Sequence, residues 1–167
     1  MRDTRRTPAH LPSSASPIEE VEERAFPRHE RRNPDTSWED EAAAEGARLR
    51  YRNQPMVELE PDPAIAPLLR PGEALLAIRR GARCERRQDE SRPGGTGLRG
   101  DLYLTSARLE LLGQVSIGIE LDSIDEVLVC SERLLLMMRD GTGITLDVEW
   151  PRLLRVEIAM ARAAARD

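Results

Sequence analysis

The sequence contains no lysine, and all 25 of its basic residues are arginine. A lysine nucleophile, a Schiff base and the lysine of a phosphate-binding loop are therefore excluded. Because arginine codons are rich in GC and lysine codons are not, this bias indicates a bacterial genome of high GC content. Aromatic residues make up only 3% of the chain, so we expect an aliphatic core and no aromatic platform for single-stranded nucleic acid.

Histidine and cysteine are also scarce. The two histidines, His10 and His29, lie in a polar N-terminal stretch, so neither a histidine-based triad nor a metal site is expected on the folded part. The two cysteines, Cys84 and Cys130, lack CxxC spacing and are too few for a disulfide framework. We expect both to behave as small hydrophobic residues in a reduced, cytoplasmic setting. We predict neither an enzyme nor a cofactor.

Long apolar runs are missing as well. No stretch has the roughly 18 apolar residues of a membrane span, and residues 1–17 lack the apolar core of a signal peptide. The net charge of −5 is far from the basic footprint of a nucleic-acid-binding domain. We therefore expect no nucleic-acid partner.

The N-terminal half of the chain divides into three predicted segments. Residues 1–36 mix Pro, Ser, Glu and Arg without a hydrophobic period, which predicts a disordered tail. Residues 37–54 are predicted to form a helix that Ser37 caps, with Asp40 completing a weak capping box. Residues 55–72 are predicted to be a linker with a short helix.

The predicted N-terminal helix has a thin apolar face. Trp38 and Leu49 are its largest apolar side chains, and we expect them to hold it against the domain if it docks. In the linker, Asp62 followed by Pro63 is a helix-start signal, and Pro71-Gly72 ends the short helix.

Residues 73–167 are predicted to form one domain. Short apolar runs with a period of two, separated by Gly, Asp and Ser, predict seven strands. They span residues 74–84, 101–105, 108–112, 117–121, 124–130, 134–138 and 144–148. At Pro151 the period changes to 3.6, which predicts an amphipathic closing helix over residues 151–166.

Two features of the closing helix are expected from its helical wheel. Glu157 falls inside the apolar stripe, where a carboxylate needs a partner, and Arg108 is the candidate. Four arginines share the opposite side of the helix. They are Arg152, Arg155, Arg162 and Arg166.

Residues 100–111 read GDLYLTSARLEL. This segment resembles the G-x-L-Y-L-T-x-x-R-L hairpin of GRAM-type members of the pleckstrin-homology (PH) superfamily, in which it forms strands two and three. The matching positions are Gly100, Leu102, Tyr103, Leu104, Thr105, Arg108 and Leu109. The chain is also similar to a group of actinobacterial PH-like proteins. The resemblance implies a mainly β (α+β) fold: a PH-like seven-stranded antiparallel β-barrel or sandwich capped by a C-terminal α-helix.

The charge of the predicted domain is polarised. Residues 74–99 hold seven arginines and three acids, a net charge of +4, whereas residues 100–149 hold ten acids and three arginines, a net charge of −7. In lipid-binding PH domains the loop between the first two strands holds phosphorylated headgroups, and arginine suits bidentate phosphate contacts. The candidate residues for an anionic ligand are Arg79, Arg80, Arg83, Arg86 and Arg87. The alternative is a solvated loop whose arginines pair with neighbouring acids.

Two functions follow from these patterns. The first is a non-catalytic, cytoplasmic interaction module that binds a protein or peptide at an exposed strand edge or through its polarised surface. The alternative is a peripheral membrane module that binds anionic lipid headgroups through the basic loop.

Overall fold

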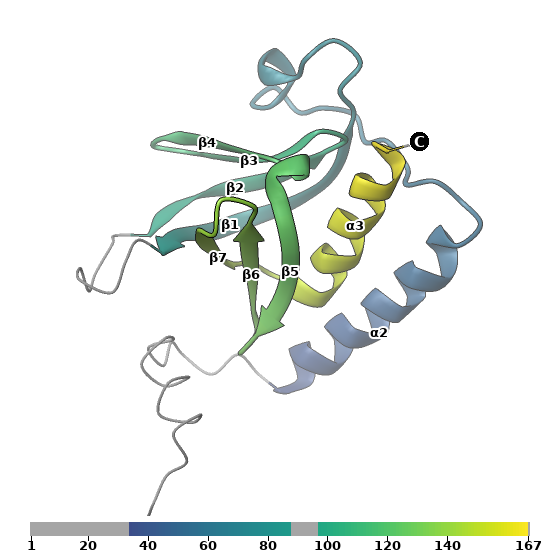
Figure 1. Cartoon of the computed structure of the whole chain (residues 1–167). Coiled ribbons are helices and arrows are strands. Elements are labelled where there is room, and N and C mark those ends of the chain that lie inside the picture. The colour runs from purple at the N-terminus through teal and green to yellow at the C-terminus, as the bar shows by residue number, and fades with distance from the viewer. Residues whose placement is uncertain (1–33, 88–96, 167) are drawn as a thin grey trace, which may run out of the picture. The chain divides into compact units, whose positions relative to one another are not determined.

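The computed structural model describes residues 34–87 and 97–166. Within them, seven strands form one antiparallel sheet and two α-helices pack beside it (Figure 1). The strands are β1 (Leu75–Arg87), β2 (Leu98–Thr105), β3 (Arg108–Gly113), β4 (Ser116–Glu120), β5 (Ile124–Cys130), β6 (Arg133–Met138) and β7 (Gly143–Asp147). All seven predicted strands are confirmed, and so is a mainly β fold with a C-terminal helix.

The sheet has the strand order β4-β3-β2-β1-β7-β6-β5. The long strand β1 pairs with β2 and, through its second half, with β7. A bulge between Arg79 and Ala82 bends β1 at Gly81, whose φ of 64° favours glycine. In the part of the chain that the structure describes, β4 and β5 do not pair with each other, so the sheet has two open edges and the predicted barrel is not closed.

Helix α3 (Pro151–Ala164) covers one side of the sheet and closes the core. Its buried side chains Leu154, Ile158 and Ala161 pack with strand residues such as Leu136 and Leu146. Burying a leucine side chain contributes roughly 1.5–3 kcal/mol, so this aliphatic cluster stabilises the domain without aromatic residues. The predicted closing helix is confirmed.

Helix α2 (Pro34–Tyr51) lies against α3 (Figure 1). It begins three residues before Ser37, the predicted cap. The side chains that meet α3 are small, because Ala44 and Ala47 pack on Val156. The prediction that Trp38 and Leu49 dock the helix is wrong: they are 76% and 53% exposed. Alanines let the two helix axes approach closely, which a tryptophan on the same face would prevent.

The segment between α2 and β1 is held by backbone and side-chain contacts. Leu59 forms an isolated bridge with Leu75 of β1. The Asp62 carboxylate accepts hydrogen bonds from the N–H groups of Ala64 and Ile65, at 3.0 and 3.2 Å, as the helix-start signal predicts. The short helix that follows is one 3-10 turn, η1 (Ala66–Leu68).

Candidate interaction site

The five candidate arginines lie on β1 rather than in the loop that follows it, because β1 continues to Arg87. The segment between β1 and β2, residues 88–96, lies outside the described residues. The placement on a strand matters, since alternate residues then face opposite sides of the sheet and do not form a single cluster.

Arg79 is buried against α3. Its guanidinium contacts the Glu157 carboxylate at 2.6 Å, and both side chains are about nine-tenths buried. Burial raises the pKa of Glu157, and Arg79 opposes that rise by a smaller amount. The burial of Glu157 is confirmed, but the predicted partner Arg108 is wrong. Arg79 is therefore a structural partner inside the fold and is not exposed to a ligand.

Arg108 instead ties β3 to the preceding linker. Its Nε lies 2.9 Å from Glu110 and 3.5 Å from Glu73. Its Nη2 donates a hydrogen bond to the backbone oxygen of Leu68 at 2.7 Å. Glu73 also accepts from the hydroxyl of Thr105 at 2.6 Å. Arg108 thus holds the linker and the β2–β3 hairpin together.

Arg80 is also paired. Its guanidinium contacts Asp62 at 2.9 Å and Asp101 at 2.6 Å, and donates to the Tyr103 hydroxyl at 3.1 Å. The hydrogen bonds with Asp101 and Asp62 raise the pKa of Arg80. The pKa of Asp101 is lowered, first by a hydrogen bond from the Gly81 N–H and then by Arg80. An anion bound at Arg80 would have to displace two carboxylates.

Arg83 and Arg86 are the remaining candidate arginines whose side chains the structure describes. Arg83 pairs with Glu85 at 3.0 Å, whereas Arg86 is exposed. The Arg87 side chain lies outside the described residues. Three of the five candidates therefore already hold carboxylates, as the alternative of internal pairing predicts.

A polar junction that the sequence did not indicate joins α2 to the start of α3. Trp150, which precedes α3, provides no side-chain cap. Asp40 of α2 takes that role: its carboxylate accepts from the N–H groups of Arg152 and Leu153 at 2.8 and 2.9 Å. Asp40 is 2% exposed. It therefore caps another helix, not the one in which it lies.

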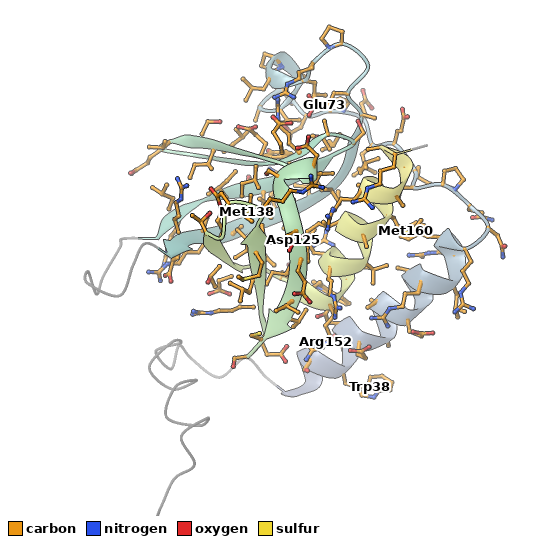
Figure 2. The ribbon with its side chains drawn as sticks, viewed as in Figure 1. Trp38, Glu73, Asp125, Met138, Arg152 and Met160 are labelled. Atoms are coloured by element: carbon orange, nitrogen blue, oxygen red, sulfur yellow. The ribbon has the colours of Figure 1, made fainter. Side chains whose placement is uncertain are left out.

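Arg152 extends this junction to the β5–β6 turn (Figure 2). Its two terminal nitrogens contact the two carboxylate oxygens of Glu132 at 2.7 Å each, and Ser37 donates to Glu132 at 3.2 Å. Ser131 and Glu132 have φ angles of 48° and 62°, a conformation that non-glycine residues rarely adopt. The turn that ends β5 is thus fixed by α2 and α3 together.

The arginine side of α3 is divided between two roles. Arg162 donates to the backbone oxygen of Ile124 at 2.6 Å and to that of Asp125 at 3.4 Å. Both belong to the start of β5, which lies beside α3 (Figure 1). Arg155 and Arg166, which share the Arg162 side of the helix, are exposed.

The free edge of β5 has two unlike halves. At its start, a bulge, the Arg162 contacts and the exposed acids Asp125 and Glu126 all discourage pairing with another strand. From residue 127 to 130 the sequence is Val-Leu-Val-Cys, and all four side chains are half-buried. Within the described residues, this half pairs only with β6. It offers an unpaired backbone edge flanked by apolar side chains.

The other sheet edge is less suitable for pairing. β4 has five residues, two of which, Ser116 and Gly118, are exposed and non-aliphatic. Its end is closed by the ion pair between Glu120 and Arg70 of the linker. Short strands and covered ends are the ordinary protection of an edge. β5 is therefore the better candidate for contact with another chain.

A trough runs between α3 and the end of α2. It consists of two adjoining hollows of about 400 and 630 Å³ that share Tyr51, Arg52 and Met160. Apart from Arg52, the walls of the smaller hollow are helical. Helical backbone groups bond within the helix, so such walls present no main-chain edge to a peptide. The smaller hollow can therefore accept side chains but not an added strand.

The two cysteines are free. Burial, with a smaller effect of Glu85, raises the pKa of the Cys84 thiol to about 11. At pH 8 only about one Cys84 in a thousand is then a thiolate, the reactive form. We expect iodoacetamide at pH 8 to modify the half-buried Cys130 first and Cys84 only after unfolding, as peptide mass mapping would show. Equal rates in the folded protein would contradict the burial of Cys84.

Among the described residues, no three side chains of His, Cys, Asp or Glu gather closely enough to bind a metal ion. Neither described helix combines the length and apolar composition that crossing a bilayer requires. His10 and His29 lie outside the described residues.

No protein-family model matches this chain, and no curated protein sequence matches it. A solved structure that does match is the crystal structure of the C-terminal domain of an unknown protein from Leishmania infantum. The match has 19% sequence identity and a TM-score of 0.40, and covers 61% of this chain and 90% of that one. Similarity at this level establishes neither a shared fold nor a shared function.

Proposed function

We propose that this protein is a non-catalytic PH-like interaction module that binds an extended peptide of a partner protein. The observation that carries the proposal is the open outer edge of β5 along its apolar second half, beside α3. A peptide added there would continue the antiparallel sheet, and its main-chain hydrogen bonds would supply affinity for almost any sequence. Alternate side chains would supply specificity.

The surroundings of β5 favour a particular peptide. Arg162 of α3 contacts the start of β5, and the exposed Arg155 and Arg166 share its side of the helix, where they would attract a carboxylate of the peptide. The apolar side chains of residues 127–130 would contact apolar residues of the peptide. We therefore expect bound peptides to combine β-branched or aliphatic residues with at least one carboxylate.

The structure of the Glu132 turn supports the same proposal. Arg152, Ser37 and α3 hold the end of β5 in place before any ligand binds. A rigid edge loses little conformational entropy on binding, which increases affinity for a flexible peptide. The junction with α2 would thus have a purpose beyond stabilising the fold.

The proposal is tested by selecting peptides from a random phage-displayed library on the immobilised full chain. Each selected peptide is then synthesised in two forms, with one or the other alternate set of amides N-methylated. In strand addition only one set points at β5, so one form should lose binding at least tenfold and the other should bind normally. Equal affinities of the two forms would contradict strand addition.

Charge substitutions locate the site on the protein. Leu128→Arg places a charge on the edge and should abolish binding of the selected peptides. The matched control is Val115→Arg on the β3–β4 turn, because Val115 is also apolar and is 54% exposed. If Val115→Arg weakens binding as much as Leu128→Arg does, the peptide binds elsewhere.

Sedimentation of the protein with vesicles that contain or lack anionic lipid tests the membrane alternative. Because Arg79, Arg80 and Arg83 are held by carboxylates, we expect no sedimentation of the protein with either vesicle. Salt-sensitive sedimentation with anionic vesicles, lost in Arg86→Ala, would replace the peptide proposal with the lipid-binding one.

A further inference from the structure

Helix α2 has an exposed face that contacts nothing else in the described part of the chain. Trp38 and Leu49 are its largest apolar residues, at 76% and 53% exposure. They are eleven residues apart, so at 3.6 residues per turn they lie about 20° apart on one face. Figure 2 shows Trp38 on the side of α2 away from α3. An exposed tryptophan is among the residues most often found at the centre of binding interfaces.

The exposed residues between them on this face are two small ones and Glu45, which pairs with Arg48. Ala42 and Gly46 lie near the middle of this face, and both are exposed. A methyl group added at Gly46 would meet no atom within 4 Å, so nothing covers this side of the helix. A second helix could therefore approach α2 closely on the side of Ala42 and Gly46 while larger side chains pack at both ends.

Charge is distributed unevenly along α2. Glu39 and Glu41 precede the middle of the helix and are exposed. Arg48, Arg50 and Arg52 follow it, and of these Arg48 also contacts Glu41 and Glu45 within the helix. The surface is thus acidic at one end and basic at the other. Only an antiparallel partner with the same distribution would match both ends.

We propose that this face binds the α2 helix of a second copy of the chain, antiparallel and about a two-fold axis. In the register that centres on residues 43 and 44, Trp38 lies opposite Leu49 of the second copy. Glu39 and Arg50 are eleven residues apart and share one side of the helix, so Glu39 lies next to Arg50 of the second copy. Each contact occurs twice, as an isologous interface requires. A parallel arrangement would instead bring like charges together.

The interface is small. An aromatic side chain buries roughly 150–250 Å², so two tryptophans and two leucines give a contact below the approximately 1,200 Å² of a standard interface. We therefore expect a weak and reversible dimer that forms only at high micromolar protein concentrations or above. It leaves the β5 edge open, so the dimer presents two peptide sites.

Sedimentation velocity of the full chain from micromolar to millimolar concentration tests the proposal. We expect the mean mass to rise with concentration, and Trp38→Ala to weaken association at least tenfold, because the two-fold axis removes two anchors at once. Val115→Ala, which removes an exposed apolar residue elsewhere, is the control and should associate like the parent. A parent chain that stays monomeric throughout would overturn the proposal.

A charge exchange tests the register. Glu39→Arg alone and Arg50→Glu alone should each weaken the dimer, whereas the double variant should restore it because each pair re-forms with reversed sign. Circular dichroism confirms that each variant remains folded. Dimerisation that survives Trp38→Ala, or a double variant no better than either single one, would contradict this antiparallel interface.

Discussion

Replacing Arg79 with methionine should destabilise the protein by about 3–5 kcal/mol, as expected when one member of a buried ion pair is lost. The Arg79 and Glu157 side chains are 12% and 10% exposed and lie 2.6 Å apart. Methionine has a similar shape and keeps the packing, so most of the loss comes from a carboxylate left in an apolar setting. Urea unfolding followed by circular dichroism measures it.

The pH dependence identifies this cause. Burial already raises the pKa of Glu157 in the folded protein, so the unfolded chain loses this proton at lower pH than the folded one. The stability contributed by protonated Glu157 is present below the unfolded pKa of about 4.3 and is lost as pH rises through the folded pKa. Without Arg79 the folded pKa is higher still. The loss of unfolding free energy in Arg79→Met should therefore be smallest in acid and largest above pH 7.

A second substitution completes the test. Arg79→Met with Glu157→Leu replaces the pair by apolar side chains, and such exchanges are often neutral or stabilising. We expect the double variant to regain most of the stability and to lose the pH dependence. A double variant as unstable as Arg79→Met would show that packing, and not charge, explains the loss.

The second large effect is expected at Asp40. Asp40→Ala removes the cap of α3 and should cost about 2 kcal/mol, near the upper end of measured capping effects, since Asp40 is buried. The same change frees Arg152 from one partner. Glu41→Ala is the matched control, because Glu41 contacts Arg152 at 3.1 Å but caps nothing and is exposed. Thermal unfolding compares the two variants, and an equal loss in both would contradict the capping role.

Asp40→Ala should also affect the proposed binding edge. Because Asp40 and Arg152 hold the Glu132 turn to α2 and α3, their loss should increase the motion of the end of β5. Peptide affinity should then fall without any change in the residues that contact the peptide. Asp40→Asn keeps one carbonyl acceptor and should retain part of both properties.

The strands and the closing helix could be predicted because local patterns decide them. Alternation marks β7 and β3, and Pro151 in the first helical position marks the start of α3. The wheel also placed Glu157 on the buried face correctly. Its partner could not be predicted, because only the crossing of β1 beneath α3 brings Arg79 to it.

Helix α2 shows the opposite case. Its sequence offers Trp38 and Leu49 as the obvious apolar contacts, yet alanines make the contact with α3. Hydrophobicity alone cannot distinguish a helix face that packs within the fold from one that stays exposed. Asp40 was placed in a capping box of its own helix, whereas tertiary structure assigns it to α3.

The candidate arginines illustrate the same limit. Counting charges along the chain found the excess of arginine in residues 74–99, but not the acids that lie across the strands from it. Asp62 and Asp101 are far from Arg80 in sequence and reach it only in the fold. The strand order, which local sequence patterns do not determine, makes β5 an outermost strand.

The central claim is that β5 accepts a peptide strand, and amide hydrogen exchange of the full chain measures this directly. With a selected peptide bound, alternate amides of residues 127–130 that face away from β6 should exchange more slowly than in the free protein. The amides of β4, the other edge, should be unchanged. Unaltered exchange along β5, with slower exchange along the trough between α2 and α3 instead, would contradict the account.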